Sequence, residues 1–209
     1  MITEIGPHKV QHSDIMNGVE KLMGDDKIDF VYSDPPWGQG NLRYWQTINM
    51  RNDGVERNNI EYDGFLHQYF SILKRYLKDV AVIEYGEKWR EDIVAIVKSY
   101  GFHHHGACTS LYKAGSKLLP VDIHLISKSG SHTLTETFSD RCYKLRGQAL
   151  VNMAFEHYLP SSAKMVLDPM CGMGYTAQAT VDNGLIFRGN ELNAARLEKT
   201  KARLRKSVE

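Results

Sequence analysis

The sequence predicts an α/β fold with a mixed sheet. Short apolar runs with strand character alternate with segments whose apolar residues recur at helical spacing. Only one pair of neighbouring strands lacks a connection long enough for a helix, so most strands should be parallel and one pair antiparallel. At 209 residues the chain is large enough for a substantial core, and we expect one domain over residues 1–209.

Seven strands are expected. Five are joined through helices, at residues 9–12, 28–33, 80–85, 165–167 and 186–188. Residues 103–112 and 121–127 are separated by a short Gly/Ser turn and should pair antiparallel. Helices are expected at 65–77, 89–100, 148–158 and 175–183 and in the basic stretch 196–206, while residues 38–63 form the longest stretch without a regular pattern.

The tetrapeptide Asp34-Pro35-Pro36-Trp37 follows the apolar run at 28–33. Two successive prolines donate no backbone hydrogen bonds, so the chain leaves the sheet there along an extended path. This path presents a carboxylate, a proline carbonyl and a large aromatic ring at the carboxyl end of a strand, where open α/β sheets bind ligands. The three groups suit a planar base with an exocyclic amine.

A glycine-rich turn follows the buried strand 165–167. It reads Asp168-Pro169-Met170-Cys171-Gly172-Met173-Gly174, and Glu191 lies at the end of the next strand. Glycines let backbone approach a ligand closely, and an acidic residue about 20 positions later can accept both ribose hydroxyls. The full fingerprint for a pyrophosphate is absent, which favours an adenosine without phosphates, such as S-adenosylmethionine.

Together the two motifs resemble those of the nucleic-acid amino-methyltransferases, which carry Asp-Pro-Pro before an aromatic residue and a loop of the form Asp-Pro-x-x-Gly-x-Gly. Their order in this chain, with the glycine loop last, is similar to that of the permuted β group of S-adenosylmethionine-dependent DNA methyltransferases, adenine-N6 type. The resemblance implies a Rossmann-like, seven-stranded mixed sheet: a circularly permuted class I methyltransferase fold entered at its third strand.

The resemblance also implies site residues. The Asp34 carboxylate and the Pro35 carbonyl would accept the two amine hydrogens, and Trp37 would stack on a flipped base. The catalytic residues are therefore expected to be Asp34, Pro35, Pro36 and Trp37. S-adenosylmethionine would be held by Asp14, Asp168, Pro169, Met170, Cys171, Gly172, Gly174 and Glu191. For Asp14 a second interpretation stays open, the N-cap of a helix that starts at Ile15.

The substrate class has alternatives. Trp37 replaces the Tyr or Phe more usual in DNA enzymes and looks like the RNA adenine methyltransferase subunits, whereas the glycine loop looks like the DNA group. Two other hypotheses are methylation of adenine in RNA and methylation of cytosine N4 in DNA. A further hypothesis is a non-catalytic subunit that binds nucleic acid. Asp rather than Ser at position 34 favours adenine.

DNA is the expected partner, with RNA as the alternative. Two short segments, residues 38–63 and 129–146, would contact it, with Arg43, Trp45, Arg51 and Arg57 in the first. The first segment could instead be a flap over the active site. Without a separate target-recognition domain the recognised sequence should be short or relaxed, and a homodimer stays open. The net charge of +1 gives no overall basic field.

Metal and membrane chemistry are not expected. Cys108, Cys142 and Cys171 lack metal-type spacing, and no nearby carboxylate or thiol completes a site with the histidines at 103–105. No stretch approaches 18 apolar residues and the N-terminus has no apolar signal core. The sequence predicts a cytoplasmic enzyme of phage or bacterial restriction-modification type.

Overall fold

A computed structural model describes residues 1–53, 60–114 and 116–208. Its centre is one sheet, which contains eight strands in this part of the chain, in the order β1-β2-β8-β7-β3-β4-β6-β5. The strands are β1 (Ile2–Ile5), β2 (His8–His12), β3 (Ile28–Ser33), β4 (Leu77–Gly86), β5 (His103–Ala114), β6 (Lys117–Ser127), β7 (Met165–Asp168) and β8 (Ile186–Glu191).

The five middle strands of the sheet are parallel. β2, β8, β7, β3 and β4 pair in the same direction, so their carboxyl ends meet at one edge. β6 is antiparallel to both β4 and β5, which confirms the expected antiparallel pair. The eighth strand, β1, was not expected: it is only four residues long and pairs antiparallel with β2 across a tight turn at Gly6.

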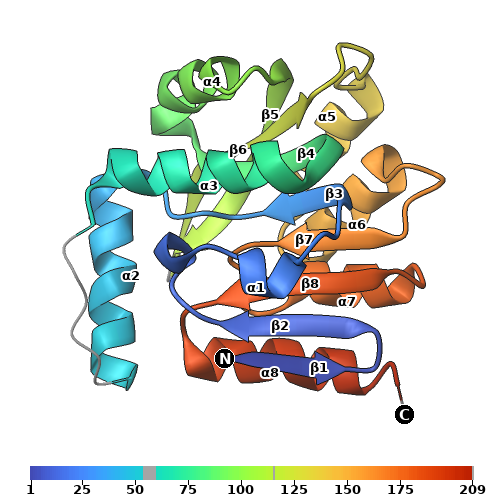
Figure 1. The fold of residues 1–209 in the computed structure, drawn as a ribbon. Coiled ribbons are helices and arrows are strands. Elements are labelled where there is room, and N and C mark those ends of the chain that lie inside the picture. The colour runs from blue at the N-terminus through green and yellow to red at the C-terminus, as the bar shows by residue number, and fades with distance from the viewer. Residues whose placement is uncertain (54–59, 115, 209) are drawn as a thin grey trace.

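Helices cover both faces of the sheet (Figure 1). Buried side chains place α1, α3 and α4 on one face, and α5, α6, α7 and α8 on the other. The helices are α1 (Glu20–Met23), α2 (Gly38–Asp53), α3 (Tyr62–Tyr76), α4 (Arg90–Ser99), α5 (Glu136–Cys142), α6 (Gln148–Tyr158), α7 (Tyr175–Asp182) and α8 (Ala194–Arg205), with 3-10 turns η1 (Ile15–Asn17) and η2 (Glu87–Trp89). None of the described helices is long and apolar enough to cross a membrane.

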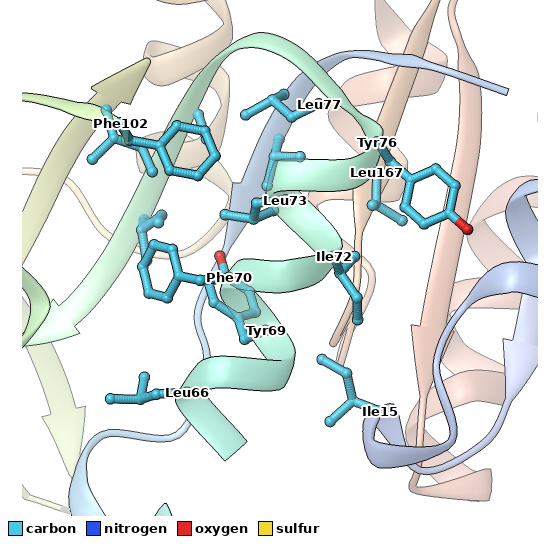
Figure 2. Close-up of a cluster of buried hydrophobic side chains, with 14 of the residues drawn as sticks. Ile15, Leu66, Tyr69, Phe70, Ile72, Leu73, Tyr76, Leu77, Phe102 and Leu167 are labelled. Carbon is cyan, nitrogen blue, oxygen red and sulfur yellow. The ribbon is translucent and has the colours of Figure 1, made fainter. Parts of the chain in front are cut away.

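Helix α3 shows how the sequence pattern becomes packing. Tyr69 and Leu73, one turn apart, are fully buried, and Figure 2 shows them along α3. Burying a large apolar side chain contributes about 1.5–3 kcal/mol, so this face accounts for the helix. The helix expected at 65–77 is confirmed, with its start three residues earlier.

The interpretation of residues 38–63 as irregular was wrong for most of that segment. Residues 38–53 form α2, which stands at the edge of the sheet, apart from the two helical layers (Figure 1). Its inward residues recur at i, i+3, i+4 and i+7 as a helix requires, but only the first two are apolar, so the pattern is weak. These residues are Leu42, Trp45, Gln46 and Asn49. Arg57 lies outside the described residues.

Candidate active site

A pocket opens at the carboxyl edge of the parallel strands. It encloses about 700 Å³ including the part open to solvent. The ends of β2, β3, β7 and β8 form its floor and α2 one of its walls. Its lining consists of Asp14, Ile15, Asp34, Pro36, Leu42, Trp45, Gln46, Asn49, Ile60, Phe65, Met170, Asn190, Glu191, Leu192 and Arg196.

The tetrapeptide after β3 forms a turn held by its own side chains. The Trp37 indole Nε1–H donates to Asp34 Oδ1 at 3.0 Å. Pro36 lines the pocket, and its carbonyl accepts a hydrogen bond from the Tyr62 hydroxyl at 3.4 Å. Pro35 is buried beneath them. The aromatic ring therefore lies against the aspartate, and the aspartate lines the pocket.

The Trp37 ring packs closely against residues of two strands, β5 and β4. It packs edge-on against Tyr112 of β5, with ring centroids 5.2 Å apart and an interplanar angle of 82°. At the end of β4, a Cβ atom on Gly86 would lie 2.8 Å from the Trp37 ring. A side chain at position 86 would therefore displace the ring.

Asp34 has unusual electrostatics for an aspartate that opens to the pocket. The surrounding protein desolvates its carboxyl and raises its pKa to about 6. The Trp37 hydrogen bond and the Arg196 guanidinium oppose that shift by favouring the carboxylate. Asp34 is therefore mostly ionised at pH 7 but gains a proton easily.

The glycine loop and Glu191 meet in one structure. The backbone N–H groups of Gly172 and Asn193 each donate to the Glu191 carboxylate at 2.7 Å. Gly172 has φ +47° and Gly174 has φ +77°, a region that disfavours other residues. A Cβ on Gly174 would lie 2.8 Å from Thr200, whereas the atom nearest to one on Gly172 would be 3.9 Å away. Gly174 thus allows packing against α8, and Gly172 leaves open space.

The other loop residues divide between lining and support. Met170 lines the pocket, while Asp168 and Cys171 are buried and do not. Asp168 Oδ1 accepts from the Met170 N–H at 3.1 Å, and burial raises the pKa of Asp168 to about 7. The Pro169 carbonyl accepts from Asn190 Nδ2 at 3.2 Å. These groups shape the loop from behind.

Asp14 caps a helical turn and also lines the pocket. Its carboxylate accepts from the Met16 N–H at 3.0 Å and so caps η1, which begins at Ile15. The same residue lines the pocket on the side of β2. The cap does not exclude ligand contact, because a carboxylate has about four lone-pair sites.

Sequence reasoning missed the inward face of α2 and its link to α8. The Arg196 guanidinium lies 3.8 Å above the Trp45 ring, and Asn193 Nδ2 donates to Asn49 Oδ1 at 2.9 Å. Trp45, expected to contact nucleic acid, therefore borders the pocket. The sequence could have indicated Arg196 as a pocket residue, because it lies in the first turn of the helix that follows Glu191.

Two pocket side chains hold buried polar atoms without a hydrogen-bond partner among the described residues. These atoms are Gln46 Nε2 and Asn190 Oδ1. Unsatisfied buried polar groups cost about 1–3 kcal/mol each and call for an explanation. A polar ligand in the pocket would provide one.

The β5–β6 hairpin extends beyond the sheet at this edge. β4 pairs with β6 only as far as Gly86 and Val121, whereas β5 and β6 continue to Ala114 and Lys117. The residues beyond the pairing with β4 are exposed and mix apolar and basic side chains. We call this the hairpin tip: Tyr112, Lys113, Lys117, Leu118 and Leu119.

The other expected contact segment, residues 129–146, only partly reaches the pocket edge. Ser129 donates hydrogen bonds to the Asp79 carboxylate near the start of β4, at the edge of the sheet opposite the pocket. Leu145 accepts from Ser110, level with the end of β4. Arg43 and Arg51 are exposed on α2.

The consecutive histidines belong to the sheet. His104 Nε2 lies 2.9 Å from His124 Nδ1, and His105 Nε2 lies 2.7 Å from the Ser127 hydroxyl. Within the described ranges, no three His, Cys, Asp or Glu side chains are grouped so that they could hold a metal ion.

Comparison with known proteins rests on structure. No protein-family model and no curated protein sequence matches the chain. Solved structures match it over nearly its whole length. The M1.HpyAVI–SAM complex has a TM-score of 0.67 at 15% identity, covering 93% of this chain and 98% of that one. The chain has the class I methyltransferase fold.

Two further structures share that methyltransferase fold. TTHA0409 of Thermus thermophilus, a candidate DNA modification methylase, matches with TM-score 0.65 and 17% identity over 96% of this chain and 95% of its own. The cytosine-N4-specific PvuII DNA methyltransferase matches with TM-score 0.63 and 12% identity over 94% and 86%. β3 and β4 precede β7 and β8 in the chain although β7 lies beside β3, which is the expected circular permutation. The fold class is confirmed, with eight strands among the described residues in place of the seven expected.

Proposed function

We propose that this protein transfers a methyl group from S-adenosylmethionine to the exocyclic N6 amine of adenine in DNA. The observation that carries the proposal is that Asp34 and Glu191, which belong to motifs far apart in the sequence, line one pocket. The similarity of the fold to DNA methyltransferases, one of them solved with SAM, supports it.

The pocket residues fit the proposed cofactor. Three carboxylates, from Asp14, Asp34 and Glu191, face one arginine, and such a lining favours a ligand with sulfonium and ammonium charges. Gln46 and Asn190 offer a donor and an acceptor in need of partners. Glu191 would accept the ribose hydroxyls with the lone pairs that the two backbone N–H groups leave. When bound, S-adenosylmethionine supplies an already activated methyl group.

The tetrapeptide would then align and polarise the amine. The Asp34 carboxylate and the Pro35 carbonyl would accept its two hydrogens, which favours the pyramidal geometry and stabilises the developing positive charge. Pro36 would fix the path of the turn, and Trp37 would stack on the base after it leaves its helix. The hydrogen bond from Trp37 to Asp34 couples the two functions.

We propose that nucleic acid lies across the pocket edge, between α2 and the hairpin tip. Arg43 and Arg51 on α2, together with Lys113 and Lys117, would contact phosphates. Tyr112 contacts Trp37, so the hairpin tip lies next to the position of a flipped base. With base contacts limited to α2 and the hairpin tip, the target would be short or relaxed.

Cytosine N4 in DNA is the second candidate target. The similarity to the cytosine-N4-specific PvuII enzyme favours it, because both targets present an exocyclic amine to the same kind of acceptors. Adenine in RNA is the third candidate target, because Trp37 in place of Tyr or Phe resembles the RNA adenine methyltransferase subunits.

One experiment separates these targets. The protein is incubated with isotope-labelled S-adenosylmethionine and either DNA or RNA, and the nucleosides are identified by mass spectrometry. Labelled N6-methyladenine in DNA supports the proposal, and labelled N4-methylcytosine or labelled RNA assigns the other substrates. Absence of label from every nucleic acid, with cofactor bound, would favour a non-catalytic subunit.

A further inference from the structure

Glu84 lies near the end of β4, close enough to Asp34 for the two charges to interact. β3 and β4 pair in parallel with Tyr32 opposite Val82 and Ser33 opposite Ile83. The next residues along the two chains are Asp34 and Glu84. Side chains alternate along a strand, so Glu84 lies on the face that carries Tyr32. The charge of Asp34 acts on both Tyr32 and Glu84, which places its carboxyl near them.

Tyr32 fixes one oxygen of Glu84. Its hydroxyl donates to Glu84 Oε1 at 2.5 Å, and its ring is buried in the core beneath α6. Because Oε1 accepts this hydrogen bond, the proton of a protonated Glu84 lies on the other oxygen, Oε2. The first charge that acts on Glu84 is that of Asp34, and the Asp34 carboxylate can accept a hydrogen bond from this proton.

Burial and charge make this pair hold a single proton near neutrality. Burial, followed by the charge of Asp34, raises the pKa of Glu84 to about 8, while that of Asp34 is about 6. Two adjacent carboxyls that share a site titrate as a pair, the second losing its proton only at higher pH. Other titratable groups that face the pair from the surrounding elements are Tyr69, Tyr112, Cys142, Asp168 and Arg196.

We propose that Glu84 is a positioning residue for Asp34: its protonated carboxyl donates to the Asp34 carboxylate, and the two groups together take up the proton that the target amine releases. This inference rests on the proposed methyl transfer. It assigns a use to a half-buried carboxyl that neither motif contains.

The amine nitrogen forms a bond to the methyl carbon as the carbon–sulfur bond breaks. The electron pair of the broken carbon–sulfur bond stays on sulfur. The nitrogen, now positively charged, loses one proton to Asp34. The pair then holds two protons and no charge, and it returns one to water at a pKa near 6. Asp34 is thereby restored as an acceptor.

The pH dependence of turnover tests the role. Because deprotonated Glu84 no longer donates and repels Asp34, kcat of the wild-type protein should fall as pH rises through about 8. Glu84→Gln keeps a donor for Asp34 and an acceptor for Tyr32 but cannot titrate. Its kcat should be lower than wild type at pH 7 yet should not decline between about pH 7.5 and 9.

Two further variants complete the test. Glu84→Leu, which provides no donor, should reduce kcat at all pH values by on the order of a hundredfold through misplacement of Asp34, with KM for the cofactor nearly unchanged. Glu91→Gln, at an exposed position of α4, should keep the wild-type profile.

A measurement that needs no turnover guards against a folding artefact. Carboxyl ¹³C NMR of the labelled protein should show a resonance that titrates near pH 8 and is lost in Glu84→Gln. An alkaline decline that persists in folded Glu84→Gln would overturn the role of Glu84. A wild-type protein that methylates no nucleic acid at any pH would instead overturn the proposed function, and the NMR titration would still report on the pair.

Discussion

The backbone N–H of Gly172 donates to the Glu191 carboxylate at 2.7 Å and thereby joins the glycine loop to the end of β8. The second oxygen of the same carboxylate accepts from the Asn193 N–H at the start of α8. One buried side chain thus holds three segments together. Its removal should affect both the fold and the ligand.

For Glu191→Ala we expect a loss of stability of about 1–3 kcal/mol, because two buried N–H groups lose their acceptor. S-adenosylmethionine should also bind at least about tenfold more weakly, since the ribose hydroxyls lose a charged acceptor. Denaturant unfolding and calorimetry measure the two effects. Glu191→Gln, which keeps one acceptor oxygen, should recover part of the stability but little of the affinity. Unchanged affinity in folded Glu191→Ala would separate Glu191 from the cofactor.

Asp34→Asn should abolish most methyl transfer without weakening the cofactor more than a few-fold. The amide still accepts the Trp37 indole N–H, so the turn is kept, but the charge that stabilises the amine is lost. Removal of such a preorganised acceptor costs on the order of a hundredfold in kcat. Single-turnover rates and cofactor titration are the measurements. Asp34→Ala should be equally inactive and should also free the Trp37 ring, and retention of about a tenth of wild-type turnover by either variant would exclude the assigned role.

Asp168 should make the protein less stable as pH rises. Its folded pKa, raised to about 7 by burial, exceeds that of the unfolded chain, so the native state binds more protons between about pH 4 and pH 7. Stability is then lost across that window. Asp168→Asn keeps an acceptor for the Met170 N–H and should flatten the decline in Tm between about pH 4 and pH 7. Asp25→Asn, at an exposed site, is the control and should leave the slope unchanged.

The hairpin tip should contribute to duplex binding. Lys113→Glu with Lys117→Glu should weaken DNA binding and reduce the slope of log K against log salt by about two, one for each phosphate that a lysine no longer neutralises. Fluorescence anisotropy over a salt series measures this. Lys21→Glu with Lys98→Glu makes the same change in net charge away from the pocket edge and should have a smaller effect. Equal slopes for the two double variants would place the nucleic acid elsewhere.

Sequence reasoning succeeded where one local pattern decides the structure. The helix at 148–158 and the strand at 28–33 have the expected bounds, because each buries a nearly continuous apolar face. It failed at α2, whose inward face is partly polar since it borders a pocket and not the core. β1 was missed because only one of its four residues is buried.

The candidate site shows the same division. The two motifs could be recognised because each is contiguous. Arg196 joins the pocket lining through the packing of α8, and Glu84 comes near Asp34 only through the register of β3 with β4. Desolvation by the surrounding protein also raises the pKa of Asp34, and this desolvation depends on packing that no local motif encodes.

The pairing of β2 with β8 has a consequence for how the pocket comes into existence. His8 and Phe187, which contact each other across these strands, are 179 residues apart in the chain. Contacts of such long sequence separation form slowly, because closing the loop costs entropy before packing compensates for it. Asp14 and Glu191 flank that pairing, so a folding intermediate with β3 and β4 already joined would still have no ligand site. Ligand binding should therefore report completion of the sheet, and ligand added during refolding should act only on the last step.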